Sequence, residues 1–110
     1  MKYLLALITL FGALAAQDWR ALAIAQIDTT IDLYQKRLVC LKEHEAAYCI
    51  ERFPQDPRSD ALAKTFAMSF PAAFYAAKLQ RDMKILERQK LCIGRAATQE
   101  AAKECAKDSR

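Results

Sequence analysis

Residues that build tight turns are scarce in this chain, which has two glycines and three prolines among 110 residues. Short strands joined by hairpins depend on such residues, so their scarcity argues against a strand-and-turn architecture. The abundant residues are instead Ala, Leu, Lys, Arg, Glu and Gln, all of which favour helix. Hydrophobic residues make up 54% of the chain, which is too many for a disordered protein. The composition therefore predicts an all-α fold.

Recognisable catalytic motifs are also missing. The chain has no Gly-rich phosphate loop, no Gly-x-Ser-x-Gly elbow, no Cys-x-x-Cys redox pair and no Cys-x-x-Cys-His haem motif. Because His44 is the one histidine, a serine or cysteine hydrolase would depend on that side chain alone. We therefore expect a protein that is not an enzyme, with no cofactor and no small-molecule substrate.

The N-terminus has the parts of a secretory signal peptide. Lys2 supplies a positive charge, and an uncharged apolar run from Tyr3 to Ala16 ends in small residues at alternate positions. This run is shorter than the ~20 residues that a membrane-spanning helix needs. We expect residues 1–16 to be a signal peptide cleaved after Ala15 or Ala16, with an uncleaved anchor as the alternative. Residues 17–110 would then form one helical domain in the periplasm or outside the cell.

Four cysteines in a small exported domain are most simply two disulfides. Of the three possible pairings we favour Cys40–Cys49 with Cys92–Cys105, each bridging a helical corner. On one unbroken helix Cys40 and Cys49 would lie ~13.5 Å apart along the axis, so this pairing requires a break near His44.

The rival pairing is Cys40–Cys105 with Cys49–Cys92, which would staple two antiparallel helices. That arrangement resembles the twin-cysteine coiled-coil–helix–coiled-coil–helix proteins of mitochondria. Proteins of that family use equal cysteine spacings on both helices, whereas the two spacings here are nine and thirteen residues. The unequal spacing favours the local pairing.

Residues 17–53 are expected to form a long helix followed by a disulfide-bridged corner. Asp18 is suited to cap this helix. Six apolar residues then follow at spacings of three and four, which is typical of one buried helix face: Ile24, Ile27, Ile31, Tyr34, Leu38 and Leu41.

Residues 54–60 are predicted to be a linker, because Pro54 and Pro57 exclude a continuing helix. Asp56 or Ser59 would cap the helix that follows, and this helix should end before Pro71.

Residues 65–77 carry no charge. We expect this run to be a buried helix–helix corner, with an interfacial membrane segment as the alternative.

The second half of the domain, residues 61–110, is expected to contain a long amphipathic helix and a short terminal helix capped by Thr98. One face of the long helix is apolar, with Tyr75, Leu79, Met83, Leu86 and Ile93. A basic stripe lies nearly opposite and consists of Arg81, Lys84, Arg88 and Arg95. The whole sequence predicts a small antiparallel helical hairpin or bundle of about four helices, stapled by two disulfides.

The charge distribution suggests a binding role. Residues 17–56 contain five basic and seven acidic residues, whereas residues 57–110 contain eleven basic and six acidic ones. We expect the basic stripe to bind the acidic surface of a protein partner, in an adaptor, inhibitor, immunity factor or accessory subunit of an envelope assembly. The simplest competing interpretation is a face that only keeps the protein soluble.

Two further functions remain open. One is association with an anionic membrane surface through residues 65–77 and the basic helix. The other is a copper or zinc chaperone using Cys40, His44 and Cys49, which have soft sulfur and imidazole ligands but number only three. We expect no nucleic acid partner, because no aromatic residues interleave the basic stripe.

Overall fold

The computed structural model describes the backbone of residues 2–106 and the side chains of residues 19–106. The side chains of the predicted signal peptide, residues 1–16, therefore lie outside the described part. Within residues 2–106 there are five α-helices and no strand, which confirms the all-α prediction with one helix more than expected. The helices are α1 (Lys2–Cys40), α2 (Ala46–Arg52), α3 (Pro57–Ser69), α4 (Ala72–Arg95) and α5 (Gln99–Glu104).

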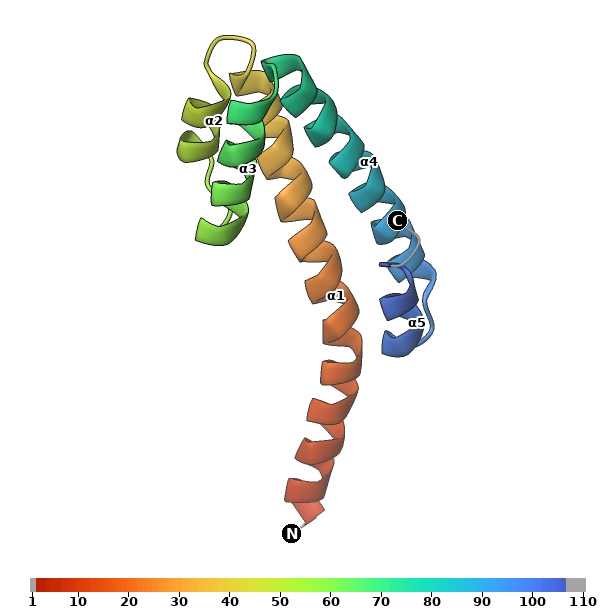
Figure 1. Cartoon of the computed structure of the whole chain (residues 1–110). Coiled ribbons are helices and arrows are strands. Elements are labelled where there is room, and N and C mark those ends of the chain that lie inside the picture. Colours follow the sequence, from red (N-terminus) through yellow and green to blue (C-terminus); the bar gives the residue numbers. More distant parts are fainter. Residues whose placement is uncertain (1, 107–110) are drawn as a thin grey trace.

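The long helices α1 and α4 lie antiparallel and form the predicted hairpin (Figure 1). The molecule is elongated, with principal extents of 63 × 26 × 21 Å. An ion pair of 2.8 Å between Asp28 of α1 and Lys90 of α4 links the two helices. Towards the end of α4, the Arg20 guanidinium of α1 donates a hydrogen bond to the Ala96 carbonyl oxygen. The apolar faces predicted on both helices point into this pairing and are half-buried or buried.

The hydrophobic core lies at the end of the hairpin where α2 packs against α1, and α3 packs against α2 and α4 (Figure 1). Four residues form its centre: Ala46 and Ile50 of α2, and Tyr75 and Leu79 of α4. The residues packed around this centre come from α1, the turn that follows it and α3, and are Tyr34, Leu38, Leu41, Ala63, Phe66 and Ala67.

Both disulfides are local, as the cysteine spacing favoured. Cys40 pairs with Cys49 across 5.7 Å between Cα atoms, and Cys92 pairs with Cys105 across 5.8 Å. The helix break expected near His44 is present, because α1 ends at Cys40 and a turn over residues 41–45 leads into α2. Such disulfides indicate that the protein folds in an oxidising compartment.

No helix in the described part of the chain is both long and apolar enough to cross a membrane.

The starts of two helices differ from expectation. Asp18 does not begin a helix, because α1 runs through it without interruption from Lys2. Helix α3 begins at Pro57, inside the predicted 54–60 linker, since proline is tolerated in a first helical turn. Asp56, rather than Ser59, caps α3 by accepting a hydrogen bond of 2.8 Å from the Ser59 N–H. The cap predicted at Thr98 is confirmed, and its hydroxyl accepts from the Ala101 N–H at 3.1 Å.

The expectation that residues 65–77 form a buried corner is wrong for residues 68–74, which are all exposed, whereas Tyr75 lies in the core and Phe66 packs against it. Phe70 is 48% exposed, Phe74 is 56% exposed and Met68 is 84% exposed. The reason is geometric: Tyr75 and Leu79 already occupy the side of α4 that faces the core. Phe74 precedes Tyr75 by one residue, which places it about 100° away around the helix.

Candidate functional site on the α3–α4 corner and the outer face of α4

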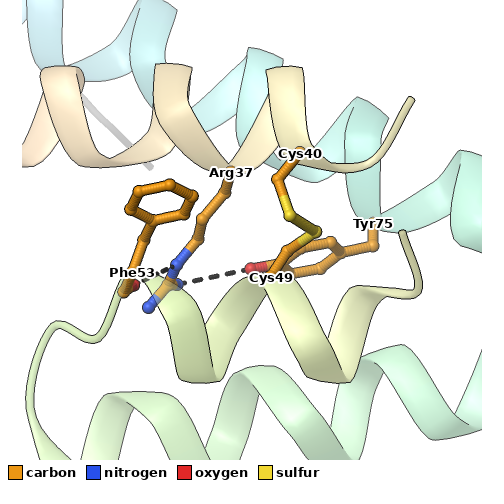
Figure 2. Close-up of a disulfide and its surroundings, with 5 residues drawn as sticks. All are labelled: Arg37, Cys40, Cys49, Phe53 and Tyr75. Carbon is orange, nitrogen blue, oxygen red and sulfur yellow. Dashed lines mark hydrogen bonds between the residues drawn. A yellow bond between two sulfur atoms is a disulfide. The ribbon is translucent and has the colours of Figure 1, made fainter. Parts of the chain in front are cut away.

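The most buried charge in the described part of the chain is Arg37 of α1, of which 2% is exposed. Figure 2 shows its guanidinium donating to the Phe53 carbonyl oxygen at 2.9 Å and to the Tyr75 hydroxyl at 3.3 Å. It also pairs with Asp60 at 2.9 Å, and the Asp60 carboxylate accepts the Gln55 N–H as well. All three guanidinium nitrogens are thus engaged within the protein, so this cluster holds α1, α3 and α4 together.

Burial raises the pKa of the Tyr75 hydroxyl above its usual value of 10.0, and the positive charge of Arg37 partly opposes that rise. The phenol is therefore neutral over the whole physiological range. A neutral phenol that touches a fully paired arginine has a structural role and offers no proton acceptor for catalysis.

The residues considered for metal binding are engaged in other contacts. Cys40 and Cys49 are bonded to each other beside the Tyr75 ring (Figure 2), so in this state neither is a thiolate ligand. The His44 ring packs against the Tyr48 ring at a tilt of 34°, with 4.4 Å between ring centroids. Among the described residues no group of three or more His, Cys, Asp or Glu side chains is placed to hold a metal ion.

The exposed corner between α3 and α4 is built from three phenylalanines. The rings of Phe66 and Phe70 lie 4.8 Å apart between centroids, and Phe74 meets Phe70 edge-to-face at 6.1 Å. Together with Ala77, Lys78 and Arg81 they line a shallow hollow of about 370 Å³. We call this hollow the aromatic corner. It offers apolar surface for contact with another molecule, bordered on one side by positive charge.

The two basic residues at the aromatic corner differ in availability. Lys78 forms an ion pair of 2.6 Å with Asp82 one turn further along α4. The Arg81 side chain is 71% exposed, and its nearest carboxylate oxygen, on Asp82, is 4.0 Å away. At that distance and exposure the ion pair between Arg81 and Asp82 contributes little to stability, so the charge of Arg81 is available to solvent.

All four residues of the predicted basic stripe are exposed on the face of α4 that points away from α1: Arg81, Lys84, Arg88 and Arg95. Three of them, Lys84, Arg88 and Arg95, form no ion pair with any residue among 19–106. The remaining basic side chains of α4, on Lys78 and Lys90, are paired with Asp82 and Asp28. The uncompensated positive charge of α4 therefore lies on its outer face.

The aromatic corner was missed at the level of sequence because its uncharged residues suggested burial. A signal was nevertheless present: Phe74 lies seven residues before Arg81, and Ala77 lies seven residues before Lys84, so they continue the basic stripe towards Pro71. Similarity to known proteins adds nothing to this arrangement, since no protein family model, curated protein or solved structure matches the chain.

Proposed function

We propose that this is an exported, non-catalytic protein that binds a protein partner with an acidic surface. The binding surface is the outer face of α4 together with the aromatic corner. One observation carries the proposal: Arg81, Lys84 and Arg88 stand exposed in a row that begins at exposed phenylalanines. Buried aromatic anchors supply most of the energy at protein interfaces, and complementary charge supplies orientation and speed of association.

A purely solubilising face explains this surface less well. Soluble surfaces usually mix charges of both signs and keep large apolar side chains apart. Here Lys84 and Arg88 have no acidic partner among the described residues, and Phe70 and Phe74 expose adjoining rings. Contiguous exposed apolar surface next to charge is a mark of interaction sites.

Export is supported by the cysteine chemistry. All four cysteines are in disulfides, and such bonds persist in oxidising compartments. The apolar N-terminal run, ending in Ala15 and Ala16, provides a route to such a compartment. We place the mature protein in the periplasm or outside the cell, where an adaptor, inhibitor, immunity factor or accessory subunit would meet an envelope partner.

Association with an anionic membrane surface is the second candidate. It is favoured by Phe70 and Phe74, which are exposed and line the same hollow as Arg81, and by the exposed Met68 of α3. Interfacial segments likewise combine large apolar side chains with basic ones.

The two candidates are separated by capture experiments on the oxidised protein. The test variant carries Arg81→Glu, Lys84→Glu and Arg88→Glu, and the matched control carries the same charge change at three exposed residues elsewhere, Lys42, Arg58 and Lys103. We expect the test variant to fold normally and to lose its partner from an envelope extract, while the control retains it. Equal capture by both variants would reject the proposed surface. Co-sedimentation with phosphatidylglycerol vesicles, lost in the test variant alone, would support the membrane candidate instead.

A further inference from the structure

Seven of the twelve exposed residues of α4 form one stripe along its outer face. Starting at Phe74, residues on the outer face recur at alternating spacings of three and four, which is the heptad spacing of helices that pair along their length. All seven are exposed, with Phe74 at 56% and Leu91 at 61%. We call them the α4 seam: Phe74, Ala77, Arg81, Lys84, Arg88, Leu91 and Arg95.

The α4 seam lies opposite the face that α4 buries. Tyr75 and Leu79 face the core, and a helix with 3.6 residues per turn places the seam about 180° away from them. The band is about 100° wide, and it spans about 25 Å between Phe74 and Leu91. A straight partner helix that crosses at about 20° stays in contact with such a band over its whole length. α1 packs against one face of α4, and the α4 seam on the opposite face is exposed.

We propose that the protein partner docks on the α4 seam as a single α-helix with acidic residues facing Arg81, Lys84 and Arg88. This inference rests on the proposed function and specifies the form of the partner. Apolar contacts at Phe74 and Leu91 would hold the two ends of such a helix, and Ala77 lets it approach closely. Three consecutive cations in the middle require carboxylates opposite, because unpaired charges at a packed helix seam oppose association.

A second copy of this chain is a poor occupant. In an antiparallel pair centred on Lys84, that lysine would meet its own symmetry mate, and Arg81 would meet Arg88. In a parallel pair every cation would meet its equivalent. Like charges set against each other discriminate against a partner, so the seam itself disfavours self-association.

A lipid surface also fits the α4 seam poorly. An interfacial helix buries an apolar face and keeps its cations at the edges. The apolar face of α4 is already packed against α1, and the cations Arg81, Lys84 and Arg88 occupy the middle of the outer face. Inserting Phe74 and Leu91 together into a bilayer would carry these three charges with them. Charge complementarity therefore favours an acidic helix.

The test uses two synthetic helices of about 20 residues and identical composition. The first carries Leu at both ends of one heptad seam and three Glu between them; in its isomer the three Glu change places with Gln on the opposite face. We expect the first peptide to bind the oxidised protein at least about tenfold more tightly than the isomer, as a sum of three exposed ion pairs predicts. The isomer binding equally well would overturn the inference.

A charge swap distinguishes helix docking from general attraction. The variant Arg81→Glu, Lys84→Glu, Arg88→Glu should lose the Glu peptide and bind a version in which Lys replaces the three Glu. The Lys42→Glu, Arg58→Glu, Lys103→Glu control should behave as wild type, and circular dichroism verifies that both variants fold. Absence of this rescue would overturn helix docking. If rescue is absent while the envelope partner is still captured through the basic residues, only the helical form of the partner is rejected. If the rescue is absent and the envelope partner is also not captured through the basic residues, the proposed function is rejected.

Discussion

Arg37 of α1 and Asp60 of α3 form an ion pair of 2.9 Å at the crowded end of the bundle, with 2% of the arginine side chain and 16% of the aspartate side chain exposed. The pair bridges 23 residues of sequence and fixes where α3 lies against α1. Because Arg37 also binds the Phe53 carbonyl and the Tyr75 hydroxyl, it joins the connection between α2 and α3 to α1 and to the start of α4.

Replacing Arg37 with Met should strongly destabilise the fold. The substitution leaves Asp60, Tyr75 and the Phe53 carbonyl without their shared donor, and removing one member of a buried ion pair costs about 3 kcal/mol. Urea unfolding of the oxidised protein measures the loss. The control Arg58→Met, at an exposed arginine of α3, should change the free energy of unfolding by about 0.5 kcal/mol or less. Equal effects of the two substitutions would show that the Arg37 cluster does not hold the helices together.

Tyr75 should make the protein sensitive to alkali. Its pKa is raised in the folded state, so the neutral phenol stabilises the fold fully below the unfolded pKa of about 10. That contribution declines as the pH rises from the unfolded pKa through the folded pKa, because the Tyr75 phenol ionises at a lower pH in the unfolded chain than in the folded protein. The free energy of unfolding of wild type should fall more steeply above pH ~10 than that of Tyr75→Phe. Tyr48→Phe, at an exposed tyrosine, should retain the wild-type slope, whereas superimposable curves for wild type and Tyr75→Phe would refute the assignment.

Each disulfide should contribute a similar amount to stability. The loops closed by Cys40–Cys49 and Cys92–Cys105 span 9 and 13 residues. Chain entropy then predicts a cost of about 3 kcal/mol for removing either bond by paired substitution to Ala. Urea unfolding without reductant measures each loss. Reductant should destabilise wild type by about the sum of the two losses and leave the four-alanine variant unchanged. A wild type that is indifferent to reductant would contradict a bracing role for the bonds.

Export predicts a shortened mature chain. The protein recovered from the periplasm or medium should begin at Ala16 or Gln17, as read from its intact mass. Replacing Ala15 and Ala16 with Asp should block this cleavage and leave the longer form in the membrane fraction, because signal peptidase requires small residues there. Recovery of the uncut wild-type chain from the cytosol with four free thiols would remove the basis for export.

The all-α fold and the disulfide pairing could be read from the sequence because both depend on local spacing. The nine-residue spacing of Cys40 and Cys49 already required a turn near His44 for these two cysteines to pair. Asp56 was one of the two caps predicted for α3, with Ser59, and it is the one that the structure shows, although α3 begins inside the predicted linker.

The sequence could not show which apolar side chains are buried in the folded protein. Phe70 and Phe74 are as hydrophobic as any core residue, but their exposure depends on the path of α3 and α1 past α4. Arg37 presents the opposite case. It lies between Tyr34 and Leu38 and resembles a surface charge until Asp60 is brought beside it by the fold. The outward-facing aromatic corner and the buried arginine are both products of tertiary packing.

The account as a whole depends on whether another molecule covers the outer face of α4 in the cell. Site-specific photocrosslinking tests this directly, with the photoreactive residue placed at Ala77 or Leu91 of the seam. Ala47 of α2 and Leu22 of α1 are matched controls, since both are exposed away from the seam. We predict one discrete protein adduct from both seam positions and none from the controls, with the crosslinked segment of the partner rich in Asp and Glu. Adducts of equal yield from all four positions, or none from Ala77 and Leu91, would contradict the account.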